Sequence, residues 1–335
     1  MAIENRVRRR LLTIGGLATV GSIGSTGSVG ALASAVFPDP DRPVRFIVPF
    51  PPGGTSDLRA RQVSAVIARQ RGWRIVVENR SGASGTIGSD QALRAPADGH
   101  TLLLGTIGTL AINPHLLVNQ PYDVATDVQP ITQFSRSVSM LMAHRDRGIR
   151  SLADLERRAR ADGPLAFAST GNATIGHMVA DLYQRRAGIG LTHVPYRGTA
   201  PAVQDFSSAQ VPLLVETPAA VWPLLQSGVA IPLAVTSAER MPQLPQVATF
   251  AEQGYPDLIL DTWQGVVTRR GLPAATLARL HQAFVGALRH PDVVRSHEEQ
   301  VNVVVANSPD AFERLMRRES ARWGAVVRET GARLI

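Results

Sequence analysis

Three loops in the 335-residue sequence combine residue types that suit the binding of a small anion. Residues 52–57, 84–86 and 169–174 are rich in Gly, Ser and Thr, and each loop leads from an apolar stretch into a helical pattern. Small residues let backbone N–H groups approach a ligand, and a helix N-terminus carries unpaired N–H donors. Such an end favours a carboxylate by about 0.3–1 kcal/mol, and by up to about 2 kcal/mol when it is partly buried. One such loop alone is more often a plain turn and helix cap, but three together favour an anion site.

Side chains in and near these loops are the first candidates for ligand contacts. We expect hydroxyl donors from Thr55, Ser56, Ser169 and Thr174, and we expect Asp57 to be a helix N-cap and not a catalytic acid. Glu216 ends an apolar strand pattern over residues 211–215. Its carboxylate either faces the ligand or caps an exposed strand end, and the sequence leaves both interpretations open.

Most signatures of catalysis are missing from the sequence. It contains no Cys and no Lys, so it offers no thiolate, no Schiff-base lysine and no P-loop lysine. No histidines have metal-ligand spacing, and the glycines at 82, 85 and 88 do not form a dinucleotide fingerprint. Ser84 lies outside a Gly-x-Ser-x-Gly motif. An exported serine hydrolase remains an alternative, although no serine has a recognisable base. We expect no cofactor and no metal.

The elements that position the loops alternate between short apolar strands and helical patterns. The first half predicts strands at 44–50, 74–78 and 101–105, a helix from 57 to 72, another that begins at 90–94, and a loop over 106–113. The second half repeats this rhythm, with a capping box at 151–154 and strands at 138–143, 165–168, 211–216 and 231–236. This order predicts an α/β fold, in which ligands lie outside the carboxyl ends of the strands.

The N-terminus has the pattern of a secretory signal peptide over residues 1–35. A basic head at residues 6–10 precedes an apolar stretch at 11–20 and an Ala-Leu-Ala-Ser-Ala ending, with cleavage expected after Ala33 or Ala35. The export route is Sec or, given three consecutive arginines, the twin-arginine pathway. The formal net charge is +8, and removing four arginines and one glutamate leaves +8 − 3 = +5. The arginines are scattered without interleaved aromatics, so we expect no nucleic-acid partner.

Eight sequence blocks, in order along the chain, resemble the Bug-type receptors of tripartite tricarboxylate transporters. The blocks are VPFPPGGTSD at 48–57 with AR at 60–61, VENRSGASGTIG at 77–88, ADGHTLL at 97–103, NP at 113–114, YD at 122–123, HVPYRG at 193–198, LAVTS at 233–237 and WQG at 263–265. The sequence departs from the family pattern at Ser81, often Pro, at Glu216, near which the family often has Asp, and at residues 269–273. The identity of the ligand therefore does not transfer.

The resemblance implies a two-lobed periplasmic binding protein of type II-like fold, each lobe a mixed or parallel sheet flanked by helices. Lobe 1 would comprise residues 36–135 and 263–335, and lobe 2 residues 136–262. A small organic carboxylate would bind between the lobes through loops and ordered water, without an arginine clamp. The partners would be the transporter's membrane subunits, and the receptor would be a periplasmic monomer. A receptor that presents its ligand to a membrane kinase is an open alternative. The ligand contacts carried over by position, together with Glu216, are Phe50, Gly53, Gly54, Thr55, Ser56, Asp57, Ser84, Gly85, Thr106, Ser169, Thr170, Asn172 and Thr174.

Overall fold

The computed structural model describes residues 37–330, which belong to a compact unit spanning Val36–Ile335. The predicted signal peptide and both candidate cleavage positions lie outside the described residues. No helix within residues 37–330 is long and apolar enough to cross a membrane.

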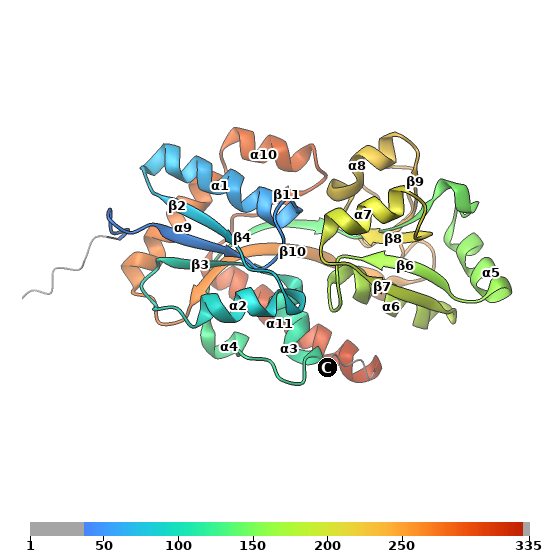
Figure 1. Cartoon of the computed structure of the whole chain (residues 1–335), viewed down its shortest axis with the longest axis horizontal. Coiled ribbons are helices and arrows are strands. Elements are labelled where there is room, and N and C mark those ends of the chain that lie inside the picture. The colour runs from blue at the N-terminus through green and yellow to red at the C-terminus, as the bar shows by residue number, and fades with distance from the viewer. Residues whose placement is uncertain (1–36, 331–335) are drawn as a thin grey trace, which may run out of the picture. The chain divides into compact units, whose positions relative to one another are not determined.

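The first of two sheets has six strands in the order β11-β4-β10-β3-β1-β2 (Figure 1). One side of the sheet is a parallel trio with β1 between β3 and the edge strand β2, while β10 runs antiparallel to both β3 and β4. The sheet is therefore mixed, as predicted. Its strands are β1 (Val44–Val48), β2 (Ile75–Asn79), β3 (Thr101–Thr106), β4 (Val128–Val138), β10 (Asp261–Arg269) and β11 (Val303–Val304).

Helices cover both faces of this sheet. One face buries apolar side chains of the first set of helices around Phe46, Phe134 and Phe284; this set comprises α1 (Thr55–Arg71), α9 (Ala274–Leu288) and α10 (Pro291–Glu298). The other face packs on α2 (Thr86–Leu93), α3 (Asn113–Leu116) and α11 (Pro309–Thr330), with the short α4 (Val124–Asp127) nearby in the chain. The loop predicted over 106–113 is wrong in part, because residues Gly108–Ile112 form a turn of π-helix that leads directly into α3.

The second sheet has five strands in the order β7-β6-β8-β5-β9. The β6, β7 and β8 strands are parallel, and β5 runs antiparallel to β8 and β9. One face packs on α7 and α8 and the other on α5 and α6. The elements are β5 (Met140–His144), β6 (Leu165–Ser169), β7 (Leu191–Pro195), β8 (Leu213–Glu216), β9 (Ala230–Val235), α5 (Leu152–Asp162), α6 (Ile175–Ala187), α7 (Thr199–Ser207) and α8 (Pro218–Gln226). Half of the predicted capping box is confirmed, since the Ser151 side chain accepts from the Asp154 N–H, but the Asp154 carboxylate accepts from the N–H of Arg150 and not from that of Ser151.

The chain passes between the sheets twice. Only Ser139 separates β4 from β5, and residues 236–260 lead from β9 back to β10. The two crossings are tied together by the buried Thr236, whose hydroxyl accepts from Ser139 N–H at 2.9 Å and donates to Leu260 C=O at 2.6 Å. The two-lobed mixed α/β fold is as predicted, and the lobe boundaries at 135/136 and 262/263 stay a prediction.

Candidate functional site

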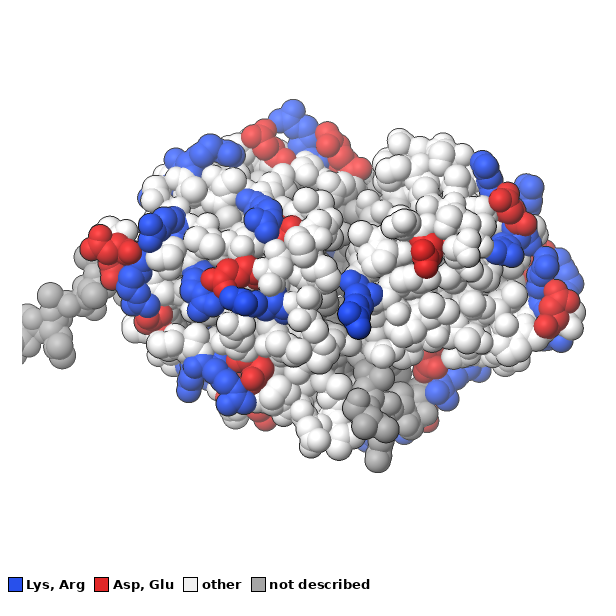
Figure 2. Space-filling view, viewed as in Figure 1, with Lys and Arg blue, Asp and Glu red and all other residues white. Residues whose placement is uncertain are grey.

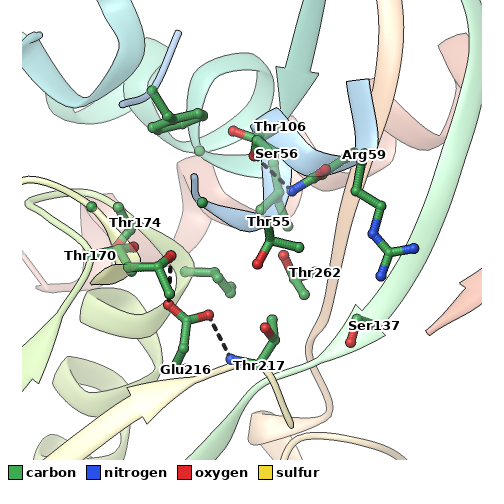
Figure 3. Close-up of a pocket in the computed structure, with 18 of the residues that line it drawn as sticks. Thr55, Ser56, Arg59, Thr106, Ser137, Thr170, Thr174, Glu216, Thr217 and Thr262 are labelled. Carbon is green, nitrogen blue, oxygen red and sulfur yellow. Dashed lines mark hydrogen bonds between the residues drawn. The ribbon is translucent and has the colours of Figure 1, made fainter. Parts of the chain in front are cut away.

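A pocket opens where loops of both sheets meet, at the carboxyl ends of β1, β3, β6 and β8 (Figure 3). This is the position that the strand–loop–helix pattern predicted for a ligand site. Its wall includes Thr55, Ser56 and Arg59 of α1 and Ser137 of β4, from the side of the first sheet, and Thr170 and Glu216 from the side of the second.

Four helix N-termini reach this pocket, and none is capped by a side chain. The N-cap residues of α1, α6, α7 and α8 all line the wall; they are Gly54, Thr174, Gly198 and Thr217. Away from the pocket, α5 and α10 have side-chain caps at Ser151 and His290, whereas α2 and α9 have none. Apart from the Thr217 N–H, which bonds to Glu216, the uncapped ends leave N–H donors and the positive ends of four helix dipoles facing one space, which favours an anion there.

The loop before α1 is held by Asp57, a buried residue that does not line the pocket. Its carboxylate accepts from Gly53 N–H at 2.9 Å and Asn79 Nδ2 at 3.0 Å, and pairs with Arg61 at 2.9 Å. Burial raises the pKa of Asp57, but these hydrogen bonds and the Arg61 charge outweigh it and hold the pKa below its usual range. The N-cap prediction for Asp57 is wrong, because the helix begins at Thr55 and Gly54 is the cap. Asp57 instead fixes the loop from within the first turn.

The corresponding loop after β6 is held by Ser169. This side chain is fully buried, and its hydroxyl lies 2.6 Å from Nε2 of His193 and 3.0 Å from Gly171 C=O. His193 stacks on His177 with ring centroids 3.9 Å apart. Burial, and to a lesser extent the neighbouring His177, lowers the pKa of His193 to about 3, so the imidazole is neutral at pH 7. Ser169 and His193 are thus a buried support of the loop and not an exposed nucleophile with its base.

Glu216 faces the pocket at the C-terminus of β8, which answers the question that the sequence left open. Its carboxylate accepts from Thr217 N–H at 2.7 Å and from the Thr199 hydroxyl at 3.5 Å, so it lies at the N-termini of α7 and α8. Burial raises the pKa of Glu216, while these hydrogen bonds partly oppose the rise.

The structure brings nine of the fourteen predicted residues to the pocket wall, namely Phe50, Gly54, Thr55, Ser56, Ser84, Thr106, Thr170, Thr174 and Glu216. The other five, Gly53, Asp57, Gly85, Ser169 and Asn172, do not line it. Asn172 is exposed, and Gly53 is a turn residue at φ 82°. Gly85 packs under the wall, where an added Cβ would lie 2.8 Å from the Thr109 side chain and 3.3 Å from Phe50.

Several wall residues were missed by the sequence interpretation, chiefly those of the strands that cross between lobes and of α7 and α8. They include Arg59, Ser135, Ser137, Thr199, Thr217, Thr262 and Gln264. Arg59 was detectable, because it precedes Val63 by four residues and Val66 by seven, and so lies on the apolar face of its helix. The resemblance implied a pocket without an arginine clamp, yet Arg59 lines it.

The fold and the pocket between its two lobes define a periplasmic binding protein, and the comparisons with known proteins identify the family. Residues 59–332 match the model described as "Tripartite tricarboxylate transporter family receptor", so the chain belongs to this family. It is a family of solute receptors, which confirms the non-catalytic interpretation.

Individual relatives match along most of their length. BugT of Bordetella pertussis is 34% identical over 297 residues, which covers 88% of this chain and 91% of that protein. Among solved structures, R. palustris Rpa4515 with adipate is 34% identical with a TM-score of 0.83, covering 88% of this chain and 99% of that one. MatC from Rhodopseudomonas palustris with bound malate is 29% identical with a TM-score of 0.82, covering 86% and 100%.

The close packing of α6 on β8 gives a first prediction. An added Cβ on Gly176 would lie 2.6 Å from the backbone oxygen of Val215, so Gly176→Ala must push the helix away from the strand. We expect it to lower the free energy of unfolding by about 1–3 kcal/mol in urea titrations. Gly286→Ala in α9 is the control; its nearest neighbour is the end of the Gln70 side chain at 3.7 Å, and alanine there should stabilise the helix by about 0.5–1 kcal/mol. Equal stabilities of the Gly176 variant and the wild type would contradict this packing.

Proposed function

We propose that this protein is an exported, periplasmic receptor that binds a small organic carboxylate in the pocket between its lobes. The observation that carries the proposal is the convergence of four helix N-termini without side-chain caps on one space. A carboxylate there receives hydrogen bonds from backbone N–H groups and from the open hydroxyls of Thr55 and Ser56. The relatives solved with adipate and malate support the same ligand class.

We infer further that the receptor delivers its ligand to the membrane subunits of a tripartite tricarboxylate-type transporter. The family description supports this partner. The membrane subunits would recognise the closed form of the receptor. A ligand that contacts both lobes binds the closed form more tightly than the open form, and it therefore shifts the equilibrium toward closure. The hinge for this closure would be the two crossings, at Ser139 and at residues 236–260, which the hydrogen bonds of Thr236 hold together.

Thermal stability of the mature protein with a panel of mono-, di- and tricarboxylates, acidic amino acids and aromatic acids tests the proposal. An acid that binds only the folded state at a hundredfold excess over its Kd stabilises it by about 2.7 kcal/mol, which raises the Tm by several degrees. The matching methyl esters are the control, and they should give no shift because they lack the anionic group. If no acid of the panel raises the Tm, the carboxylate proposal is wrong.

A further inference from the structure

Arg59 places a buried positive charge in the pocket wall. Its side chain leaves the second turn of α1 and is 3% exposed, and within residues 37–330 its guanidinium makes one hydrogen bond, from Nη2 to Gln300 Oε1 at 2.9 Å. The other terminal nitrogen, Nη1, is buried and has no partner among the described residues. Burial lowers the pKa of Arg59 to about 10, which leaves the guanidinium charged at pH 7.

No carboxylate among residues 37–330 balances this charge within ion-pair distance. Elsewhere in the fold arginines such as Arg45 and Arg270 are paired with glutamates, and basic and acidic side chains are interspersed over the face drawn in Figure 2. Gln300, which accepts a hydrogen bond from the guanidinium, and His297, whose pKa is affected by its charge, are both uncharged at pH 7. Burial, and to a lesser extent Arg59 itself, lowers the pKa of His297 to about 4. A buried cation without a counterion destabilises a fold. Its presence in a ligand pocket therefore indicates that the counterion is supplied by the ligand.

The guanidinium is separate from the other polar groups of the pocket. Figure 3 shows it on the side of the pocket where Ser137 lies, while Glu216 and Thr170 lie on the opposite side. Thr55 and Ser56 are one helical turn earlier in α1, at the helix N-terminus. A carboxylate bound to the helix N-termini therefore leaves the guanidinium free for a second acidic group.

Resting on the carboxylate-receptor function proposed above, we propose that Arg59 forms a second anion subsite, which selects ligands that carry two acidic groups. One acidic group binds the N–H and hydroxyl groups at the helix N-termini. The other forms hydrogen bonds with the Arg59 guanidinium, whose planar fork matches a carboxylate in two-point geometry. Ser137, on the same side of the pocket, is the hydroxyl positioned to complete this subsite.

Matched acid pairs test the subsite. Calorimetry measures binding of straight-chain α,ω-dicarboxylates of four to eight carbons, and of monocarboxylates of the same lengths, to the mature protein. We expect the wild type to bind its preferred diacid at least tenfold more tightly than the monoacid of equal length. Arg59→Met should reduce this ratio to less than about threefold by weakening only the diacid. Arg69→Met, which removes an exposed arginine of the same helix outside the pocket, should leave the ratio unchanged.

The Tm of the ligand-free variants separates a binding role from a structural one. Because methionine removes a buried unpaired charge at similar volume, Arg59→Met should keep or raise the Tm of the ligand-free protein. Should this variant not fold, Arg59→Lys decides; lysine keeps the charge but not the two-point geometry, so the diacid should bind at least threefold more weakly and the monoacid as before. An unchanged diacid affinity, or an equal loss for both acids, would overturn the proposal. If the wild type binds monoacids as tightly as diacids, the proposal of an Arg59 subsite is wrong but the receptor function stands. If the wild type binds no acid, the proposed receptor function is wrong as well.

Discussion

Removal of one open hydroxyl from each side of the pocket, in the double variant Thr55→Ala with Thr170→Ala, is expected to weaken binding of the preferred acid by roughly a few hundredfold. Both side chains line the pocket, and neither hydroxyl bonds to another described residue, so each is free to donate to a ligand. A hydrogen bond to a charged group contributes about 1.5–3 kcal/mol, or roughly ten- to a hundredfold in affinity. Since Thr55 belongs to the first lobe and Thr170 to the second, the double variant should also close less.

Calorimetry of the two single variants and the double variant, with small-angle scattering in the presence and absence of the acid, measures both effects. Thr192→Ala is a matched control, because Thr192 is an exposed threonine of β7 that does not line the pocket. If Thr170→Ala binds the acid and compacts like the wild type, the first lobe holds the ligand alone and the closure mechanism proposed above fails.

Residue type predicts which loops carry hydroxyl groups, but it does not predict which of these hydroxyls are free to bind a ligand. Thr55, Ser56, Ser169 and Thr174 are equivalent by composition and loop context. In the fold, however, Thr174 donates its hydroxyl to Gly171 C=O at 2.8 Å, and Ser169 is enclosed with His193. Ser56 accepts from Gln264 at 2.9 Å and keeps its proton for a ligand. The bond of Thr174 is local, whereas those of Ser169 and Ser56 are made with residues distant in sequence, and hydrophobic periodicity carries no information about either kind of bond.

The strand–loop–helix rhythm predicted seven of the described strands and the loops of α1 and α6, because apolar strand patterns and glycine-rich turns are local signals. It did not predict the strands β4, β7, β10 and β11. It missed the N-termini of α7 and α8, which follow Arg197-Gly198 and Glu216-Thr217 without a glycine-rich loop. Pro218 at the first position of α8 was a usable signal, since proline favours that position. The wall residues Ser137 and Thr262 lie on β4 and β10, whose antiparallel pairing joins segments more than a hundred residues apart. No local pattern reports that pairing.

The loop at the N-terminus of α1 should depend on the charge of Asp57, and Asp57→Asn is expected to lower the free energy of unfolding at pH 7 by about 3 kcal/mol. The buried carboxylate accepts hydrogen bonds from Gly53, Asn79 and Arg61. An asparagine at this position has only one acceptor oxygen, so its NH₂ group would face at least one of these three donors and that hydrogen bond would be lost. Removing one member of a buried charged network costs about 3–5 kcal/mol when its partner stays buried, and less here because Arg61 is half exposed. Urea titrations at pH 7 measure the difference. Asp162→Asn, which removes an exposed partner of Arg158, is the control and should unfold like the wild type.

The same substitution has a predictable dependence on pH. Because the pKa of Asp57 is lower in the folded protein than its ordinary value of about 3.9, the carboxylate adds stability above that pH, and this stability is lost as the pH falls through the lower folded pKa. The stability gap between wild type and Asp57→Asn should therefore be full at pH 7 and smaller at pH 3, where Asp57 of the unfolded chain is largely protonated. A stability gap of equal size at pH 3 and pH 7 would show that the substitution acts through altered hydrogen-bonding geometry. The charge of Asp57 would then not be what holds the pocket loop.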